Sequence, residues 1–143
     1  MKTGYESELA RIQEDMIAIC LEYIENKCDT IYIYASCEKK AISCNFFFDI
    51  NGEIYKKHQL PNGYNTNMKR QMSCLKILAN DVEELMSICI EYETDMPTEM
   101  KIVYDMKNNK VSACYKYECV YANTDKSAND IFECWYQQVR QNI

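Results

Sequence analysis

Nine cysteines are the side chains in this sequence that are most able to bind a metal or to react. They are Cys20, Cys28, Cys37, Cys44, Cys74, Cys89, Cys114, Cys119 and Cys134. No two of them form a C-x-x-C pair, the spacing that zinc sites and dithiol redox centres commonly use. Most occupy apolar positions of predicted helices and strands, where a reduced cysteine behaves as a small hydrophobic side chain. We therefore predict free thiols and no metal site, as is usual in the reducing cytoplasm.

His58 is the single histidine, and so the only imidazole that could activate a cysteine or serine nucleophile. The adjacent carboxylates Glu83 and Glu84 point in different directions on a predicted helix, so they do not form an acid–base pair. Three widely spaced glycines cannot build a phosphate-binding loop. The sequence predicts a protein that is not an enzyme, with no catalytic residues and no cofactor. The alternative is a small hydrolase or ligand-binding protein that uses a cysteine with His58 in a pocket under the long helix.

The composition indicates one acidic globular domain over residues 1–143, with 48% hydrophobic and 27% charged residues. A net charge of -6 argues against nucleic-acid binding, which needs a basic surface, and suits a basic partner. The N-terminal segment carries Glu6 and Glu8 and lacks the apolar run of a signal peptide. The longest purely apolar runs, such as Phe46–Phe48, are far shorter than a membrane span. We expect a cytoplasmic protein that is not inserted in a membrane.

The hydrophobic periodicity predicts three helices and five strands. The helices are expected over residues 7–26, from a cap at Thr66 or Asn67 to about Thr94, and from Ser127 through Val139. The strands are expected over residues 31–38, 41–49, 53–60, 99–106 and 111–118. The order α-β-β-β-α-β-β-α, with tight turns between strands, predicts an α+β domain with a mainly antiparallel five-stranded sheet packed against helices. We expect the last helix to cover an end of the sheet.

Local signals fix two of the expected boundaries. Asn51-Gly52 is a strong type I′ hairpin signal, because both central residues of that turn need a positive φ angle. Ser127 with Asp130 at the third position after it is a helix N-terminal signal. Lys39 and Lys40 join the first two strands.

The charges are distributed unevenly along the chain. The segment Leu78–Glu99 contains seven acidic residues and no basic one. They are Asp81, Glu83, Glu84, Glu91, Glu93, Asp95 and Glu99. Two interpretations remain open: a solvated helix face, or a docking surface for a basic partner. Tyr32 and Tyr34 are further candidate contacts: they face opposite to Ile31 and Ile33, and either pair could lie on a sheet face that no helix covers.

The order of elements and several short segments resemble the YezG/EsaG-type antitoxin (immunity protein) family of Gram-positive bacteria. The segments are residues 31–35, 46–49, Asn51-Gly52, His58 with Leu60-Pro61, residues 100–105, 110–111 and 115–117, and Trp135. The resemblance implies a cytoplasmic protein that binds and neutralises a toxin domain, commonly a nuclease, exported by a type VII (LXG or EsaD-like) system. The partner would be a cognate toxin with a basic nuclease-type domain, and the antitoxin a monomer or weak dimer. The predicted toxin contacts are Asp81, Glu83, Glu84, Glu91, Glu93, Asp95, Tyr32 and Tyr34.

Overall fold

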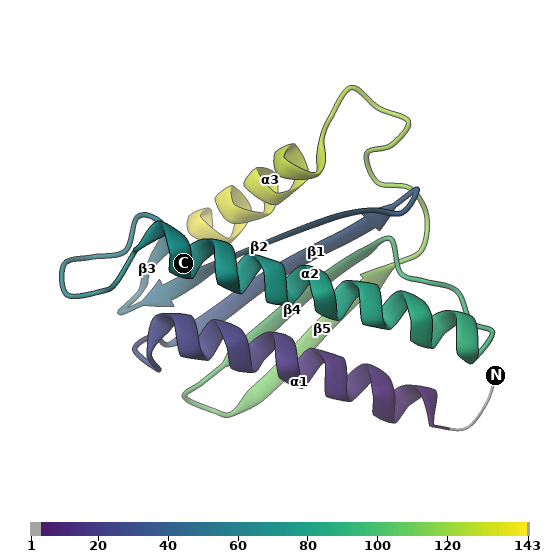
Figure 1. Ribbon diagram of the computed structural model, residues 1–143. Coiled ribbons are helices and arrows are strands. Elements are labelled where there is room, and N and C mark those ends of the chain that lie inside the picture. The colour runs from purple at the N-terminus through teal and green to yellow at the C-terminus, as the bar shows by residue number, and fades with distance from the viewer. Residues whose placement is uncertain (1–3, 143) are drawn as a thin grey trace.

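The computed structural model describes residues 4–142, and this part of the chain contains three helices and five strands. In chain order these are α1 (Tyr5–Ile24), β1 (Thr30–Glu38), β2 (Ala41–Ile50), β3 (Glu53–Lys56), α2 (Met68–Glu91), β4 (Glu99–Asp105), β5 (Lys110–Lys116) and α3 (Ala128–Gln141). The strands form one antiparallel sheet in the order β3-β2-β1-β4-β5 (Figure 1). The predicted α+β fold and the predicted order of elements are confirmed. No helix within these residues is long and apolar enough to cross a membrane.

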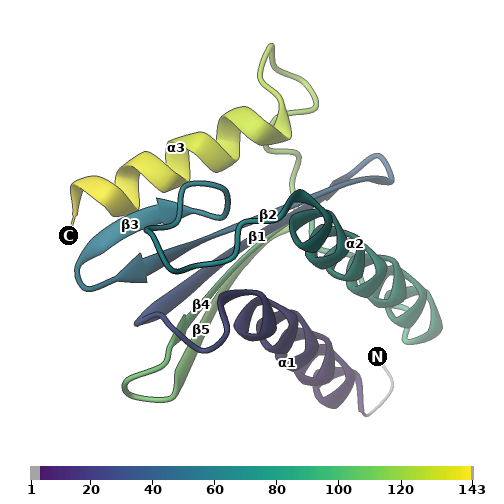
Figure 2. The same ribbon diagram turned by 60° about the vertical axis from the view of Figure 1, so that its left-hand side comes forward.

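Helices cover both faces of the sheet. α1 and α2 pack side by side on one face, and α3 lies on the other (Figure 2). α1 and α2 run antiparallel, so the Tyr5 hydroxyl at the start of α1 lies 3.6 Å from the Cys89 thiol near the end of α2. The sequence placed α3 at an end of the sheet. It covers a face instead, because its buried side chains Phe132 and Trp135 pack on aromatic rings of β1 and β2.

The side chains of β1 alternate between the two helical layers, as they must in a strand. Ile31 and Ile33 belong to the main core under α1 and α2, whereas Tyr32 and Tyr34 belong to a second cluster under α3. The expectation that these tyrosines lie on a sheet face without a helix is therefore wrong. Tyr34 is only 1% exposed, and Tyr32 is half-buried.

Two hairpin turns have the left-handed backbone that a type I′ turn requires. Asn51 (φ 54°) and Gly52 (φ 87°) confirm the turn predicted between β2 and β3. Lys39 (φ 52°) and Lys40 (φ 66°) form the turn between β1 and β2 without a glycine. Because a left-handed conformation is unfavourable for residues with a Cβ atom, this second turn depends on the pairing of the strands it joins.

The helix starts agree with their sequence signals, and one strand is shorter than predicted. Asn67 caps α2 by accepting a backbone N–H of the first turn. Ser127 and Asp130 cap α3 reciprocally, as a capping box. β3 ends at Lys56 rather than at Leu60, so His58 lies in a turn.

Candidate binding surface on helices α1 and α2

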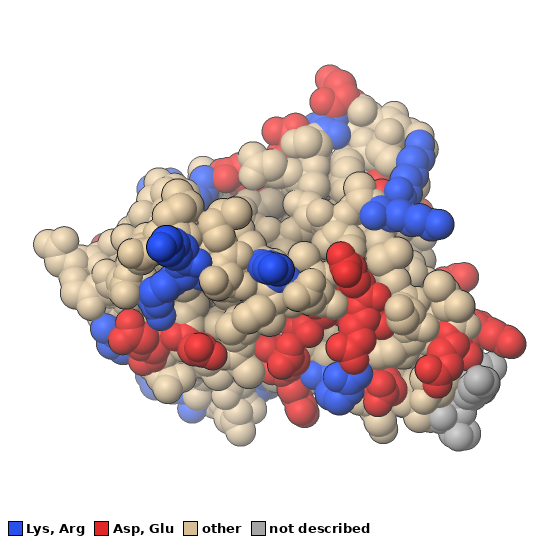
Figure 3. Space-filling model, in the orientation of Figure 1, with Lys and Arg blue, Asp and Glu red and all other residues tan. Residues whose placement is uncertain are grey.

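Acidic side chains gather over α1 and α2 (Figure 3). Four of them lie where the two helices meet, and we call this group the acidic seam: Glu8 and Asp15 of α1 with Asp81 and Glu84 of α2. Helical spacing places Glu8, Arg11 and Asp15 on one side of α1. The Arg11 guanidinium pairs with Glu8 at 3.1 Å and also reaches Glu84 on α2. Arg11 thus bridges the two helices and offsets part of the negative charge at one end of the seam.

Asp81 is the buried member of the acidic seam. Its side chain is 6% exposed, and its Oδ2 atom has no hydrogen-bond partner. The pKa of Asp81 is raised to about 8, first by burial and then by a hydrogen bond with Asp15. The negative charges of Asp15 and Glu84 also raise this pKa, whereas Arg11 lowers it. At neutral pH the Asp81 carboxyl group therefore keeps its proton.

The burial of Asp81 shows that the acidic stretch of α2 is not a solvated helix face throughout. Asp81 lies on the side of α2 that faces α1, in the same helical stripe as Leu78 and Leu85, both 0% exposed. The other predicted acidic contacts are exposed. They are Glu83, Glu84 and Glu91 on α2, and Glu93 and Asp95 immediately after it.

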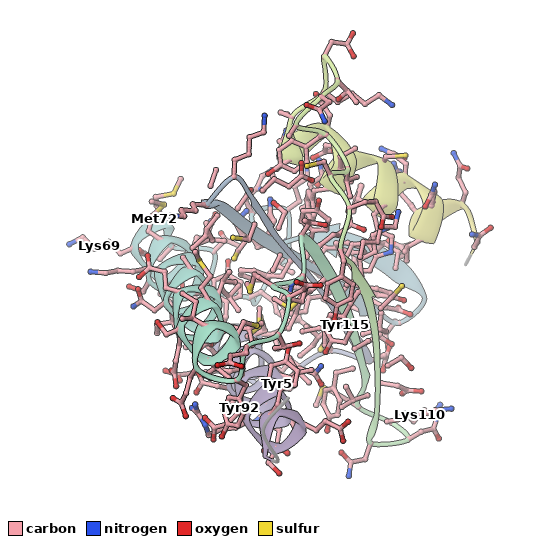
Figure 4. The ribbon with its side chains drawn as sticks, turned by 90° about the vertical axis from the view of Figure 1, so that its right-hand side faces the viewer. Tyr5, Lys69, Met72, Tyr92, Lys110 and Tyr115 are labelled. Atoms are coloured by element: carbon pink, nitrogen blue, oxygen red, sulfur yellow. The ribbon has the colours of Figure 1, made fainter. Side chains whose placement is uncertain are left out.

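The charges of α2 are arranged against the helix dipole. Lys69 and Arg70 lie in the first turn, where acidic side chains are favoured, and Glu91 is the last residue, where bases are favoured. Figure 4 shows Lys69 and Met72 projecting outward from the N-terminal part of α2, with Tyr92 near the other end. Each such charge at a helix end costs roughly 0.3–1 kcal/mol at low ionic strength. Arg70 has a structural role, because its guanidinium donates hydrogen bonds to the backbone carbonyls of Glu22 (3.3 Å) and Tyr23 (3.0 Å) at the end of α1. The dipole of α2 does not explain the exposed charges of Lys69 and Glu91, which favours a role in binding for them.

Tyr32 and Tyr34 lie away from the acidic seam and hold α3 on the sheet. The Tyr34 hydroxyl donates a hydrogen bond to Glu99 Oε2 at 3.1 Å. The Tyr32 ring stacks on Phe47, with ring centroids 4.7 Å apart and an interplanar angle of 5°. Trp135 of α3 meets Tyr32 edge-on at 5.9 Å. In this fold the two tyrosines are packing residues, so the exposed acidic residues are the better candidates for partner contact.

The alternative prediction, a site formed by a cysteine with His58, requires a cavity that both side chains line. A cavity of about 220 Å³ lies between α1 and α2, and Cys74, Tyr23 and Arg70 are among its lining residues. His58 does not line it and is exposed in the turn after β3. Partial burial and the positive charges of its neighbours Lys57 and Lys56 lower the pKa of His58. The structure therefore does not bring His58 to the cysteine that lines this cavity.

All nine cysteines are free thiols. Cys20, Cys74 and Cys89 are among the buried ones, and Cys114 and Cys134 are exposed. Burial raises the pKa of the Cys20 thiol well above its ordinary range, with smaller contributions from Cys74. In residues 4–142 no three His, Cys, Asp or Glu side chains form a group that could hold a metal ion.

Three residues of this surface, Glu8, Arg11 and Asp15, are absent from the predicted site. Their helical spacing was a usable signal, because residues three and four apart share one side of a helix. The burial of Asp81 could also be predicted, because Asp81 follows the apolar Leu78 by three positions and therefore lies on the same side of the helix. The missing information was the pairing of α1 with α2, which places the two acidic groups opposite each other.

Comparison with protein-family models and with curated protein sequences found no match for this chain. The features that bear on function are therefore the charge arrangement of α1 and α2 and the sequence resemblance described above.

Proposed function

We propose that this protein is a non-catalytic binding protein of the antitoxin (immunity) type, which captures a basic, nuclease-type toxin domain in the cytoplasm. The observation that carries the proposal is the run of exposed acidic residues on α2 and immediately after it: Glu83, Glu84, Glu91, Glu93 and Asp95. The acidic residues of α1 extend the same surface. A nuclease has a basic cleft for phosphate groups, and an acidic surface complements such a cleft. The resemblance to the YezG/EsaG-type family supports the same class of partner.

The exposed acids would act mainly on the rate of association. An exposed ion pair contributes only about 0–1 kcal/mol, because water and salt screen it. Several like charges on one surface nevertheless attract a basic partner over long range and can raise the association rate constant by about 10-fold or more at low salt. Glu83 and Glu91 are suited to a test because both are exposed and neither pairs with Arg11.

Co-expression with a nuclease-type toxin domain, taken from a gene adjacent to the one for this protein, tests the function directly. We expect the cells to survive and the two proteins to purify together in a fixed ratio. Cell death at the same rate with and without this protein, and no co-purification, would exclude the antitoxin function.

A charge-reversal pair tests the surface. Replacing Glu83 and Glu91 with Lys should slow association with the toxin domain about 10-fold at low salt and leave the dissociation rate almost unchanged. The control replaces Glu118 and Asp125 with Lys, which changes the net charge equally at exposed positions outside α1 and α2. Equal association rates for the two double variants in stopped-flow measurements would show that α2 is not the docking surface.

A further inference from the structure

We propose that the exposed face of α2 binds the same face of a second copy of this chain, with the two helices antiparallel and a two-fold axis near Asn80. The proposal goes beyond the proposed function and does not rest on it. A second copy fits this face because the charges of the face are complementary to themselves under that symmetry.

The charges of α2 divide the helix into two halves of opposite sign. The first half, residues 68–79, carries Lys69, Arg70 and Lys76 and no acid, whereas the second half, residues 80–91, carries four acids and no base. In Figure 3 blue side chains lie over the left-hand part of α2, and red ones lie over its middle and right-hand part. An antiparallel second copy brings the basic half of each helix to the acidic half of the other.

The exposed charges are placed almost symmetrically about Asn80. Lys69 lies eleven residues before Asn80, and Glu91 lies eleven residues after it. Lys76 lies four residues before Asn80, and Glu83 three residues after it. Residues seven or eight apart recur on nearly the same side of a helix, so the four charges share one face. Two antiparallel copies therefore form one pair of contacts about 16 Å from the axis and another about 5 Å from it, each occurring twice.

These four charges have no ionic partner in residues 4–142, whereas their charged neighbours on α2 do. Lys69, Lys76, Glu83 and Glu91 are exposed, and none of them forms an ion pair within this part of the chain. The adjacent Glu84, in contrast, pairs with Arg11 of α1. The charges that the protein itself leaves unpaired are the ones that an antiparallel second copy pairs.

The side chains between and beside the charges allow the two helices to approach. Ser73 and Ser87 lie seven residues before and after Asn80, and all three side chains are exposed. Met72 (58% exposed) and Ile90 (79% exposed) are five turns apart on one flank of this face. A two-fold axis that crosses both helices at right angles keeps each flank on its own side, so Met72 of one copy meets Ile90 of the other.

We expect a weak dimer, because contact along one helix buries less area than a standard interface and exposed ion pairs are weak. At physiological ionic strength the screening length is about 8 Å, so salt screens the repulsion between two chains of net charge -6 more than it screens the close pairs. Sedimentation velocity between micromolar and millimolar protein should show the mass rising from one chain towards two. A mass of one chain at every concentration would overturn the proposal.

A charge swap tests the face. Lys76→Glu places acid opposite acid, and Glu83→Lys places base opposite base, so each should weaken self-association about 10-fold. The double variant, Lys76→Glu with Glu83→Lys, restores opposite charges and should associate like the unmodified protein. Lys110→Glu is the control, because it makes the same change of net charge at an exposed position of β5. A double variant as weak as the single ones, or equal weakening by Lys110→Glu and Lys76→Glu, would overturn the proposal.

Disulfide trapping tests the antiparallel direction. The exposed Cys114, Cys119 and Cys134 are first replaced by Ser, so that the buried thiols remain and do not compete. In an antiparallel pair, Ser73→Cys of one copy lies opposite Ser87→Cys of the other, and in a parallel pair it lies opposite itself. With oxidised glutathione as the oxidant, a mixture of the two variants should give mainly the mixed dimer. Crosslinked dimers of Ser73→Cys alone, formed as readily as the mixed dimer, would overturn the proposal.

The two proposals can fail separately, because self-association is measured without a toxin domain. A protein that dimerises through α2 and forms no toxin complex would support the second copy as the partner of this face and exclude the antitoxin function. A protein that stays monomeric at every concentration and still captures the toxin domain would support the antitoxin function and overturn the dimer.

Discussion

Trp135 of α3 meets Phe47 of β2 edge-on, with 5.1 Å between the ring centroids and an interplanar angle of 72°. This contact lies at the centre of the second hydrophobic cluster, the one on the opposite side of the sheet from α1 and α2. Phe47 is 0% exposed and Trp135 9% exposed, so both rings are largely removed from water. Aromatic pairs in this geometry are favourable beyond the area they bury. The attachment of α3 to the sheet therefore depends on a few large aromatic side chains.

Replacing Trp135 with Ala is expected to lower the free energy of unfolding by about 3 kcal/mol or more, because it leaves a cavity over Phe47. Urea unfolding monitored by circular dichroism measures the loss, since Trp135 is the only tryptophan and its fluorescence disappears with it. The control is Cys134→Ala, one residue away and exposed, which should change stability by less than about 0.5 kcal/mol. Similar stability of the two variants would show that α3 is not held by this cluster.

The free energy of unfolding should fall as the pH rises towards 8, because the folded state holds the Asp81 proton more tightly than the unfolded state does. The pKa of this carboxyl group is about 8 in the folded protein against an ordinary value of 3.8, so the folded state binds the proton more tightly. Its stabilising contribution is present below pH 4, is lost progressively above that, and is gone above pH 8. In urea unfolding, the decrease between about pH 6 and pH 8 should be about 1–2 kcal/mol larger for the unmodified protein than for Asp81→Asn. Identical pH profiles for the two proteins would contradict the raised pKa.

Glu38, at the end of β1, holds the loop between β5 and α3. It is 3% exposed, and its carboxylate accepts backbone N–H groups of Val120 (2.8 Å), Tyr121 (3.3 Å) and Ala122 (2.9 Å). Replacing Glu38 with Ala removes the acceptor for all three donors. The expected loss is about 2 kcal/mol or more of unfolding free energy, with faster hydrogen exchange at residues 120 and 122.

Glu118→Ala is the matched control for that loop, because Glu118 is exposed and close by in sequence. It should leave both the unfolding free energy and the exchange rates nearly unchanged. If Glu38→Ala also leaves the exchange of residues 120 and 122 unchanged, the carboxylate is not what orders the loop.

The sequence by itself determined the local structure and the order of the elements. The type I′ turn at Asn51-Gly52 and the reciprocal cap at Ser127 and Asp130 depend on residues within a few positions of each other. The hydrophobic periodicity that predicts each helix and strand likewise depends only on residues within that element. These are short-range properties, so a single sequence is enough to predict them. β3 was predicted too long because its end at Lys56 has no comparable local signal.

Only the tertiary structure decided which helix packs on which face of the sheet and which side chains of the helices meet. The alternation along β1 gives two faces, but it does not show that α3 occupies the face of Tyr32 and Tyr34. The acidic run of α2 likewise does not show that Asp81 meets Asp15 of α1. Burial and pKa depend on which distant segments are brought into contact, and the spacing of residues along the chain does not contain that information. Exposed Glu83 and buried Asp81 lie two positions apart, and only the packing of α1 on α2 separates a charge in water from a carboxyl group that keeps its proton.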